Sequence, residues 1–392
     1  MKFSKAFTVF AAGLFSISLA TAQTKDYASL VNPFIGTGGH GHTYPGASMP
    51  FGMMQLSPDT RLEGWDGCGG YHYSDSLIYG FSHTHLSGTG IPDYCDILLM
   101  PFTGDVKWSN KEYASAFSHS NEKAHAGYYE VLLDKHHIKA ALTTTVRAGM
   151  HQYTFPAGAE QGKVLVDLRH RDEVLESSIE VVTPYQVRGM RRSKSWAPNQ
   201  VIYFYMKFDQ PIQSYGIAVN DQLQEGSSAA GKNIKSYFSF DTRNNKTLQV
   251  KVGISGVSMD NAQMNLDTEM RDWDFNAVQT NAENAWNKEL GKIEVSGGTK
   301  DEQTVFYTAL YHASLNPNTY TDVNGEFRGT DKQVHKADGF TNYSVFSLWD
   351  TYRAFHPLMN IINKKRSNDW INTFLVQYKY GGMLPVWEAQ RQ

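Results

Sequence analysis

A change in residue patterning near residue 265 constrains the fold more than any other feature of this chain. Before it, short segments rich in Val, Ile, Thr, Tyr and Phe are separated by turn residues. Several of them alternate apolar and polar side chains, as half-buried antiparallel strands do. These segments cover residues 141–155, 163–168, 201–208, 234–240 and 247–254. Many short strands at this spacing predict an antiparallel β-sandwich, which we expect over residues 23–265.

The pattern after the change is helical. Residues 266–295 are polar and rich in Asn, which predicts a helical linker. Thr299 and Glu302 then match a capping box, in which each residue satisfies a backbone N–H of the other. We therefore expect a helix that reaches Leu315, with apolar residues on one face.

Two more helices are expected toward the C-terminus. One covers residues 345–359, where Pro357 ends or kinks it. The other is capped by Ser367. Its apolar stripe consists of Ile371, Phe374, Leu375 and Tyr378.

Three striped helices over residues 296–392 would leave an apolar face without a partner. We therefore expect these residues to be the first part of a longer helical domain. The alternative is a small helical cap that lies on the sandwich.

Residues 1–22 have the pattern of a signal peptide. Lys2 and Lys5 give a positive start, residues 6–19 are largely apolar, and Ala20 and Ala22 match the cleavage pattern, which makes Gln23 the mature N-terminus. The apolar stretch is shorter than the roughly 20 residues of a membrane helix, so export by cleavage is favoured over an N-terminal anchor. No later segment approaches the length of a membrane span. We expect a periplasmic or secreted protein.

The charge balance argues against nucleic acid as a partner. The formal net charge is −3, whereas nucleic-acid binders usually carry a basic surplus on one face. The chain has 22 Tyr, 21 Phe and 8 Trp against 19% charged residues, a balance that favours carbohydrate, because aromatic faces pack on sugar rings. Cys68 and Cys95 are too few for a disulfide scaffold and lack zinc-site spacing. Export would permit a bond between them, but we favour two free thiols.

Two glycine-rich segments each contain a His-x-His pair. The first covers residues 32–46 with His40 and His42, and the absence of lysine there excludes a phosphate-binding loop. The second covers residues 80–90, where His83 and His85 would share one face of an extended strand. Neither pair has a further ligand at a fixed offset. Structural hydrogen bonding is therefore favoured over a metal site.

Among the tryptophans that stand directly beside a carboxylate, three lie in the segments of interest: Trp65 with Asp66, Trp349 with Asp350, and Trp387 with Glu388. Such a pair suits a pyranose, whose C–H face packs on an aromatic ring while its hydroxyls bind a carboxylate. Two structural alternatives remain open. Trp65 could pack on the sandwich edge, and Asp350 could form an i,i+3 salt bridge with Arg353. The GxSxG and HExxH motifs of common hydrolases are absent.

Taken together, these segments resemble glycoside hydrolase family 92, the calcium-dependent exo-acting α-mannosidases. The resemblance is carried by residues 31–38, 44–52, 64–75, 80–90, 306–318, 346–358 and 381–388. It implies an N-terminal β-sandwich, a helical linker, and a C-terminal (α/α)6 toroid that this chain does not complete. It also implies hydrolysis of α-mannosidic bonds, often α-1,2, in mannose-containing glycans, with inversion and with the help of calcium.

The resemblance places the catalytic acid and base, and most calcium ligands, beyond Gln392. It therefore assigns this chain substrate contacts and no catalytic residue. The implied contacts are Trp65, Asp66 and Asp350, with Trp349, Trp387 and Glu388 nearby. Two departures stand out: the Ala-Gln-Arg-Gln sequence after Glu388, and Cys95 in place of an expected glycine. A non-catalytic glycan-binding protein and an inactive product are the alternatives, and the oligomeric state stays open.

Overall fold

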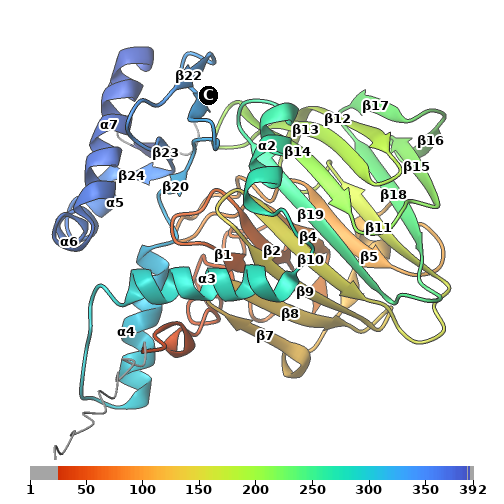
Figure 1. Cartoon of the computed structure of the whole chain (residues 1–392), viewed down its shortest axis with the longest axis horizontal. Helices are drawn as coiled ribbons and strands as arrows, with labels where there is room; N and C mark the ends of the chain where they lie inside the picture. The colour runs from red at the N-terminus through yellow and green to blue at the C-terminus, as the bar shows by residue number, and fades with distance from the viewer. Residues whose placement is uncertain (1–24, 386, 389–392) are drawn as a thin grey trace, which may run out of the picture.

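The structure is a computed structural model that describes residues 25–385, 387 and 388. The expected signal peptide lies outside the described residues. Two large antiparallel sheets dominate the molecule, with helices beside them (Figure 1). The eight-stranded sheet contains, in spatial order, β1 (Ala47–Ser48), β2 (Gln55–Asp59), β4 (Gly80–Ser82), β5 (Leu98–Phe102), β11 (Gln161–Asp167), β18 (Ile234–Asp241), β15 (Ser214–Val219) and β16 (Gln222–Gln224).

The second sheet has nine strands. Its order is β17 (Ser228–Gly231), β12 (Glu173–Thr183), β13 (Gln186–Lys194), β14 (Gln200–Phe208), β19 (Thr247–Ser255), β10 (Ala148–Thr154), β9 (Ile138–Thr144), β8 (Tyr128–Leu133) and β7 (Glu122–His125). The main apolar core includes residues of both sheets, such as Leu56 and Leu99 from one and Leu142 and Val250 from the other. The predicted β-sandwich is confirmed, and β11, β14, β18 and β19 lie within two residues of the expected segments.

The expected segment 141–155 is a hairpin of β9 and β10 and not one strand. The strands β12 and β13 were not predicted, because their many charged residues hide the alternation that their burial shows. Arg191 in β13 is one such residue. Its side chain is fully buried and ion-paired with Asp96 and Asp172.

Helices follow the sandwich in the sequence, as expected. They are α2 (Met259–Glu269), α3 (Phe275–Leu290), α4 (Lys300–Ala313), α5 (Leu348–Thr351), α6 (Phe355–Ile362) and α7 (Lys364–Gly381). The α2 and α3 helices cover the outer face of the nine-stranded sheet (Figure 1), where Leu266 and Phe275 pack in one cluster with Met150 and Tyr205. The nine-stranded sheet therefore buries apolar side chains on both faces, against the other sheet on one side and against α2 and α3 on the other.

The remaining elements are short. They are η1 (Ala28–Leu30), η2 (His119–Asn121), α1 (Asn110–Tyr113), and the pairs β3 (Leu77–Ile78) with β6 (Ser115–Ala116), β20 (Asn318–Thr319) with β23 (Tyr343–Ser344), β21 (Glu326–Arg328) with β22 (Val334–Lys336), and β24 (Phe346–Ser347) with β25 (Trp387–Glu388).

The predicted capping box is confirmed at α4. The Thr299 hydroxyl accepts from the Glu302 backbone N–H, and the Glu302 carboxylate accepts from the Thr299 N–H. The prediction for Pro357 was wrong, because the break falls at residues 352–354, between α5 and α6. Pro357 is the third residue of α6, and proline is tolerated in a first helical turn.

The predicted start of α7 at Ser367 was also wrong. Asn363 is the N-cap residue, its amide donates to Glu289, and Ser367 is buried inside the helix. Trp370 is buried in the helical core and Phe374 packs against that core, whereas Ile371, Leu375 and Tyr378 of the predicted stripe are more than half exposed.

An apolar surface therefore remains on α6, α7 and the turn that follows. Its members are each more than half exposed: Ile361, Ile371, Leu375, Tyr378, Met383 and Leu384. This agrees with the expectation of helical stripes that lack a partner. No helix in the described part of the chain has the length and apolar character needed to cross a membrane.

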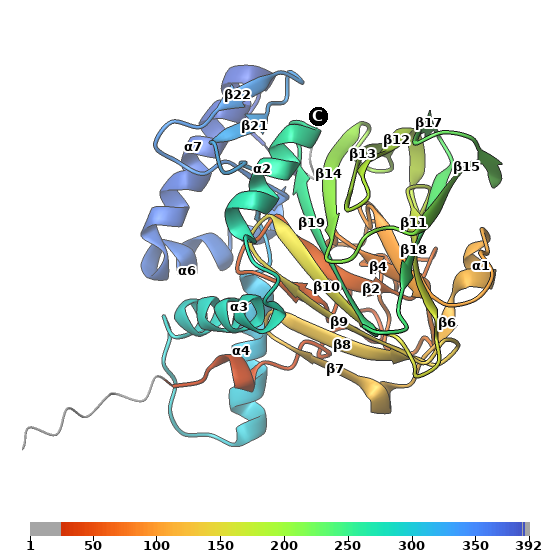
Figure 2. The ribbon, with the colours of Figure 1, turned by 45° about the vertical axis from the view of Figure 1, so that its right-hand side comes forward.

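Phe51 joins the sandwich to the helices. It lies between β1 and β2, yet its ring belongs to the helical core that contains Trp370. The Arg366 guanidinium lies 4.1 Å from the ring centroid. The Phe51 N–H donates to the Ser314 carbonyl at 2.7 Å, and its own carbonyl accepts from the Thr319 N–H at 2.8 Å. These contacts fix α6 and α7 beside the sandwich (Figure 2).

Candidate functional site

A pocket of about 520 Å³ lies where the sandwich meets the helical part. One wall is the loop that follows β4, residues 87–91, together with Trp196. The opposite wall is formed by residues 345–351, which include β24 and α5, with Phe355 and His356. Asn316 also lines the pocket, and its side-chain amide donates to the Ser87 carbonyl of the loop wall at 3.0 Å.

Trp349 and Asp350 both line this pocket. The Trp349 side chain is 65% exposed, so its ring is available to a ligand. The Ser347 hydroxyl donates to Asp350 Oδ2 at 2.5 Å, while Oδ1 accepts no hydrogen bond from the described residues. Arg353 is not the partner of Asp350; its Nε lies 3.4 Å from the Tyr352 hydroxyl. The salt-bridge alternative is therefore wrong, and one carboxylate oxygen is left for a ligand.

The backbone of Trp387 and Glu388 lies beside the same wall. Trp387 pairs with Ser347, and Glu388 pairs with Phe346, in the β24–β25 ladder. Ser347 and Phe346 both line the pocket. Two of the three Trp–carboxylate pairs are thus brought together by one short ladder.

Trp65 and Asp66 do not line this pocket but lie beside an adjoining one. Trp65 is 58% exposed and lines a neighbouring pocket of about 540 Å³. Its ring meets the His42 ring edge-on, with centroids 4.2 Å apart, while His40 Nδ1 lies 2.7 Å from Asp66 Oδ1. The two pockets share Gly90. His40 and His42 therefore support the Trp65–Asp66 pair, a role that sequence spacing did not indicate.

Trp196 lines the pocket and was missed by the sequence analysis. It is 63% exposed in the turn between β13 and β14. The local signal was a turn, because Trp196 stands in a short Ser/Ala/Pro segment after a charged stretch.

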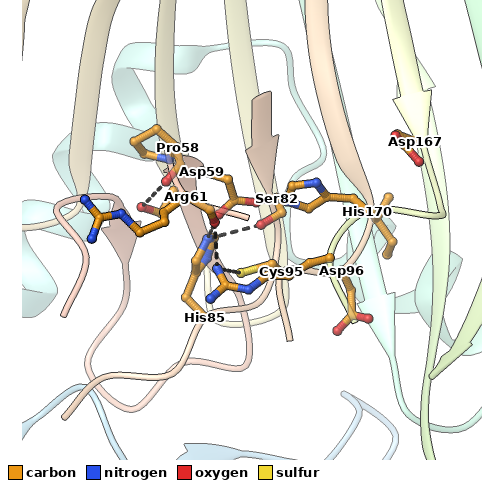
Figure 3. Close-up of polar contacts among 12 residues, drawn as sticks. Pro58, Asp59, Arg61, Ser82, His85, Cys95, Asp96, Asp167 and His170 are labelled. Carbon is orange, nitrogen blue, oxygen red and sulfur yellow. Dashed lines mark hydrogen bonds and ion pairs between the residues drawn. The ribbon is translucent and has the colours of Figure 1, made fainter. Parts of the chain in front are cut away.

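A buried polar cluster lies behind the loop wall (Figure 3). Asp59, at the end of β2, accepts from His85 Nε2 at 2.7 Å and from His170 Nε2 at 2.8 Å. His85 Nδ1 donates to the Gln55 carbonyl at 2.8 Å. Since His85 lies only two residues before Ser87, these bonds fix the start of the pocket wall. The cluster is therefore structural support for the site.

The pKa values of this cluster show a buried ion pair. Burial alone would raise the pKa of Asp59, but the charges and hydrogen bonds of His85 and His170 outweigh it and hold that pKa below its ordinary value. Burial alone would lower the pKa of His85, but Cys95 and Asp59 raise it to about 10. Asp59 is therefore ionised and His85 protonated at neutral pH.

Asp59, His85 and Cys95 each offer one ligand atom, all within 4.8 Å of one another. This set does not fit calcium, which takes six to eight oxygen ligands, because it offers one carboxylate, one imidazole and one thiol. The Arg171 guanidinium also lies 3.4 Å from the Cys95 sulfur, and its charge opposes a cation there. Within the described residues, this is the one group of three or more such side chains close enough to hold a metal.

His83, Cys68 and Cys95 are buried and have structural roles. His83 is fully buried; its Nδ1 lies 2.6 Å from the Ile97 carbonyl and its Nε2 lies 3.0 Å from His151 Nε2. The expected extended strand does not include His83 and His85, because β4 ends at Ser82, and their side chains enter different networks. Cys68 and Cys95 are free thiols, as favoured. Cys95 has φ +58°, in the left-handed region, which explains why the resemblance implied glycine there.

Comparisons with known proteins agree with this architecture. Residues 30–255 match the family model for the glycosyl hydrolase family 92 N-terminal domain, and residues 261–392 match that for the family 92 catalytic domain. An "uncharacterized secreted glycosidase" of Arthroderma benhamiae is 27% identical over 374 residues, which are 87% of this chain and 47% of that protein.

Solved structures from Bacteroides thetaiotaomicron are similar as well. The family GH92 α-mannosidase BT3965, in complex with mannoimidazole, is 37% identical with a TM-score of 0.90, over 94% of this chain and 50% of that one. The inverting mannosidase BT2199 is 30% identical with a TM-score of 0.82, over 92% and 50% of the two chains. This chain spans about half the length of these relatives. With both domain models matched in order along its sequence, the chain belongs to glycosyl hydrolase family 92, a family of glycosidases.

Proposed function

We propose that this chain supplies one wall of the mannose-binding site of an exported, calcium-dependent α-mannosidase that cleaves with inversion, often at α-1,2 linkages in glycans. The solved relatives support the reaction class, since they are α-mannosidases, and one of them is an inverting enzyme. The mannoimidazole bound to one relative supports mannose as the sugar.

The observation that carries the proposal is the exposed Trp349–Asp350 pair in the pocket between sandwich and helices. Sugar hydroxyls can donate to the open oxygen of Asp350 while the C–H face of the ring packs on an indole. We assign substrate contacts to these two residues. We extend the assignment, by proximity, to four more: Trp65, Asp66, Trp387 and Glu388.

The acid and base belong elsewhere in this proposal. An inverting glycosidase needs two carboxyl groups about 6.5–9.5 Å apart, one to protonate the leaving oxygen and one to activate water. Among the described side chains that line the pocket, Asp350 carries the one carboxylate. We place the second carboxylate in the half of the relatives' length that this chain does not cover. Asp350 then binds and orients the sugar.

Calcium and export complete the proposal. The donor set of Asp59, His85 and Cys95 does not fit calcium, so we place most calcium ligands in that same uncovered half. Bound calcium would supply positive charge that helps to distort the sugar ring. Export is supported by the word "secreted" in the name of the Arthroderma benhamiae relative and by the signal-peptide pattern of residues 1–22.

The domain boundaries are part of the proposal. We assign residues 1–22 to the signal peptide, 23–265 to the sandwich, 266–295 to the linker and 296–392 to the start of an (α/α)6 toroid. The exposed apolar surface of α6 and α7 is consistent with helices that pack against further helices.

The test is release of mannose from α-1,2-mannobiose by residues 23–392, with added calcium and again with chelator. Mannose binding to the same sample is measured in parallel by NMR. We expect binding without release, which is also what a glycan-binding protein without turnover would show. Calcium-dependent release would contradict our placement of the acid and base. A folded sample that binds no mannose would contradict the proposed function.

A further inference from the structure

Val345 has a backbone conformation that its side chain disfavours. Its φ is +66°, in the left-handed region, where the Cβ atom of an L-residue comes too close to a carbonyl oxygen and a β-branched residue is a genuine outlier. Val345 lies between β23 and β24, is 9% exposed and lines the pocket. Glycine or asparagine would adopt this conformation at lower cost. Strain of this kind persists only where the surrounding structure fixes it, and it is concentrated at ligand sites.

The backbone on either side of Val345 belongs to two separate ladders. Ser344 lies in the β20–β23 ladder, and Phe346 lies in the β24–β25 ladder. The chain therefore changes from one ladder to the other at this single residue. The pocket wall of residues 347–351 follows directly. The conformation of Val345 thus sets the direction in which that wall continues.

The Val345 side chain meets the sandwich. It packs in one buried apolar cluster with Leu86 and Tyr94, and Ile91 packs against that cluster. These three residues belong to the segment that contains the loop wall, residues 87–91. Tyr94 has φ +81°. The cluster therefore joins two residues in the left-handed region, one beside each wall of the pocket.

Tyr94 is held from both sides along the chain. Asp93 accepts from the Ala197 N–H at 2.7 Å, and the Cys95 N–H donates to the Thr84 carbonyl at 2.8 Å. The sandwich half of the contact is therefore fixed. The Val345 side chain ties the helical wall of the pocket to it.

We infer that Val345 is a positioning residue of the sugar site. Its isopropyl group holds the wall of Trp349 and Asp350 at a fixed place relative to the loop wall. Contact with Leu86 and Tyr94 requires the strained backbone. The inference rests on the proposed function, because it takes the sugar to bind at Asp350. A wall that is in place before the sugar arrives binds more tightly, since apparent affinity falls in proportion to the fraction of molecules that are competent.

The first test titrates mannose into Val345→Gly by NMR. Glycine relieves the strain and removes the contact, so the wall becomes free to adopt other conformations. If about one fifth of the molecules keep the competent wall, the affinity falls about fivefold. Val345→Ala is the milder change, which removes two methyl groups but leaves the strain, and it should cause a smaller loss. Val345→Ile keeps a β-branched apolar side chain and should keep the affinity within about twofold of that of the unmodified chain.

Lys332→Gly is the matched control. Lys332 also has a positive φ, +67°, but it is exposed in the turn between β21 and β22 and does not line the pocket. The change relieves similar strain in the same helical part of the protein. Mannose affinity should therefore equal that of the unmodified chain.

A second readout does not depend on sugar. The Trp349 indole N–H signal is followed by NMR and is identified by its loss in Trp349→Phe. In Val345→Gly without sugar we expect this signal to broaden or split, whereas Lys332→Gly should leave it unchanged. Tyr94→Leu removes the other half of the contact and should act in the same way. The two changes together should weaken mannose binding little more than either alone, because they remove one contact.

The outcomes separate the two proposals. If the unmodified chain is folded and binds no mannose, the proposed function fails and this inference fails with it. If mannose binds, and Val345→Gly binds it as tightly as the unmodified chain with an unchanged Trp349 signal, only this inference is overturned. A lower thermal midpoint in that variant would then assign Val345 to stability alone. Val345→Ala decides by the same criteria if Val345→Gly does not fold.

Discussion

The Ser347 hydroxyl donates to the Asp350 carboxylate at 2.5 Å across the first turn of α5. This contact holds Asp350 in one orientation in the pocket it lines, and its other oxygen accepts no hydrogen bond from the described residues. A carboxylate that is pre-oriented binds a sugar hydroxyl at lower entropic cost than one that rotates freely.

Ser347→Ala should therefore weaken mannose binding about three- to tenfold, the range for one hydrogen bond to a charged group in part-exposed surroundings. Ser347→Thr keeps the hydroxyl and should retain most of the affinity. Titration of mannose into each variant measures the effect. Equal affinity in Ser347→Ala and the unmodified chain would show that this contact does not orient Asp350.

Gly70 lies against the buried cluster that supports the pocket wall. A Cβ there would come within 2.5 Å of Asp59 Oδ1 and 3.0 Å of Cys95 Sγ, and the residue has φ +96°. Gly70→Ala should destabilise the protein by about 3 kcal/mol or more, from steric overlap and backbone strain together. Gly64→Ala is the control, because Gly64 has φ +94° but nothing within 4 Å of the added atom. Its expected cost is about 1 kcal/mol.

Urea unfolding of the two alanine variants tests this account of Gly70. If Gly70→Ala lowers the free energy of unfolding no more than Gly64→Ala does, the cluster can rearrange to accommodate an added methyl group at little cost, and this account is wrong.

The His85–Asp59 pair makes stability depend on pH above neutrality. The folded state raises the pKa of His85 from 6.5 to about 10, against burial and through Cys95 and Asp59. Its contribution is complete below about pH 6.5 and is lost as the pH rises toward about 10, with a slope of up to about 1.4 kcal/mol per pH unit. Urea unfolding at pH 6, 7.5 and 9 should show this decline, and His85→Gln should show a shallower one. Parallel pH profiles for the two proteins would refute the shift.

Acid should destabilise the protein through a different pair of histidines. Burial lowers the pKa of His83 to about 4 and holds the pKa of His151 well below its ordinary value. Both are neutral when folded, while the unfolded chain takes up protons as the pH falls below about 6.5, so stability falls with pH from there. Unfolding midpoints between pH 7 and 4 measure this. His151→Gln should remove part of the pH dependence, and an unchanged acid limb in that variant would contradict it.

The Asp66–His40 contact should matter for binding and not for stability. His40 is exposed and Asp66 is partly so, and exposed pairs add little to folding. Asp66→Asn should leave the thermal midpoint unchanged while it weakens mannobiose binding, if this pair helps to hold Trp65. A lower midpoint with unchanged affinity would assign the contact to stability alone.

The sequence predicted the parts of the site that local chemistry marks. Trp349 and Asp350 were predicted because an aromatic beside a carboxylate suits a sugar ring, and the structure places both at one pocket, although their contact with a sugar stays a prediction. The capping box at Thr299 was found because it depends on two residues at a fixed spacing. In each case the residues that form the signal lie within a few positions of one another in the sequence.

The missed parts depend on distant segments. Asp59 meets His85 and His170 only after β2, the loop beyond β4 and the segment after β11 come together, so no spacing reveals the cluster. Trp196 reaches the pocket because Asp93, more than a hundred residues earlier, holds its backbone. The burial of Trp370 on α7 was missed for the same reason, since its ring packs on Phe51, which lies more than three hundred residues earlier.

The central claim is that Asp350 contacts a bound mannose, and the most direct test is mannose titrated into the unmodified chain and into Asp350→Asn, which keeps the shape and removes the charge. Asp338→Asn is the control, because Asp338 is also exposed in the helical part but does not line the pocket. We predict a loss of affinity of tenfold or more for Asp350→Asn, as expected when a charged hydrogen bond is lost, and no change for Asp338→Asn. Equal mannose affinity in all three proteins would contradict the assignment of this pocket as the sugar site.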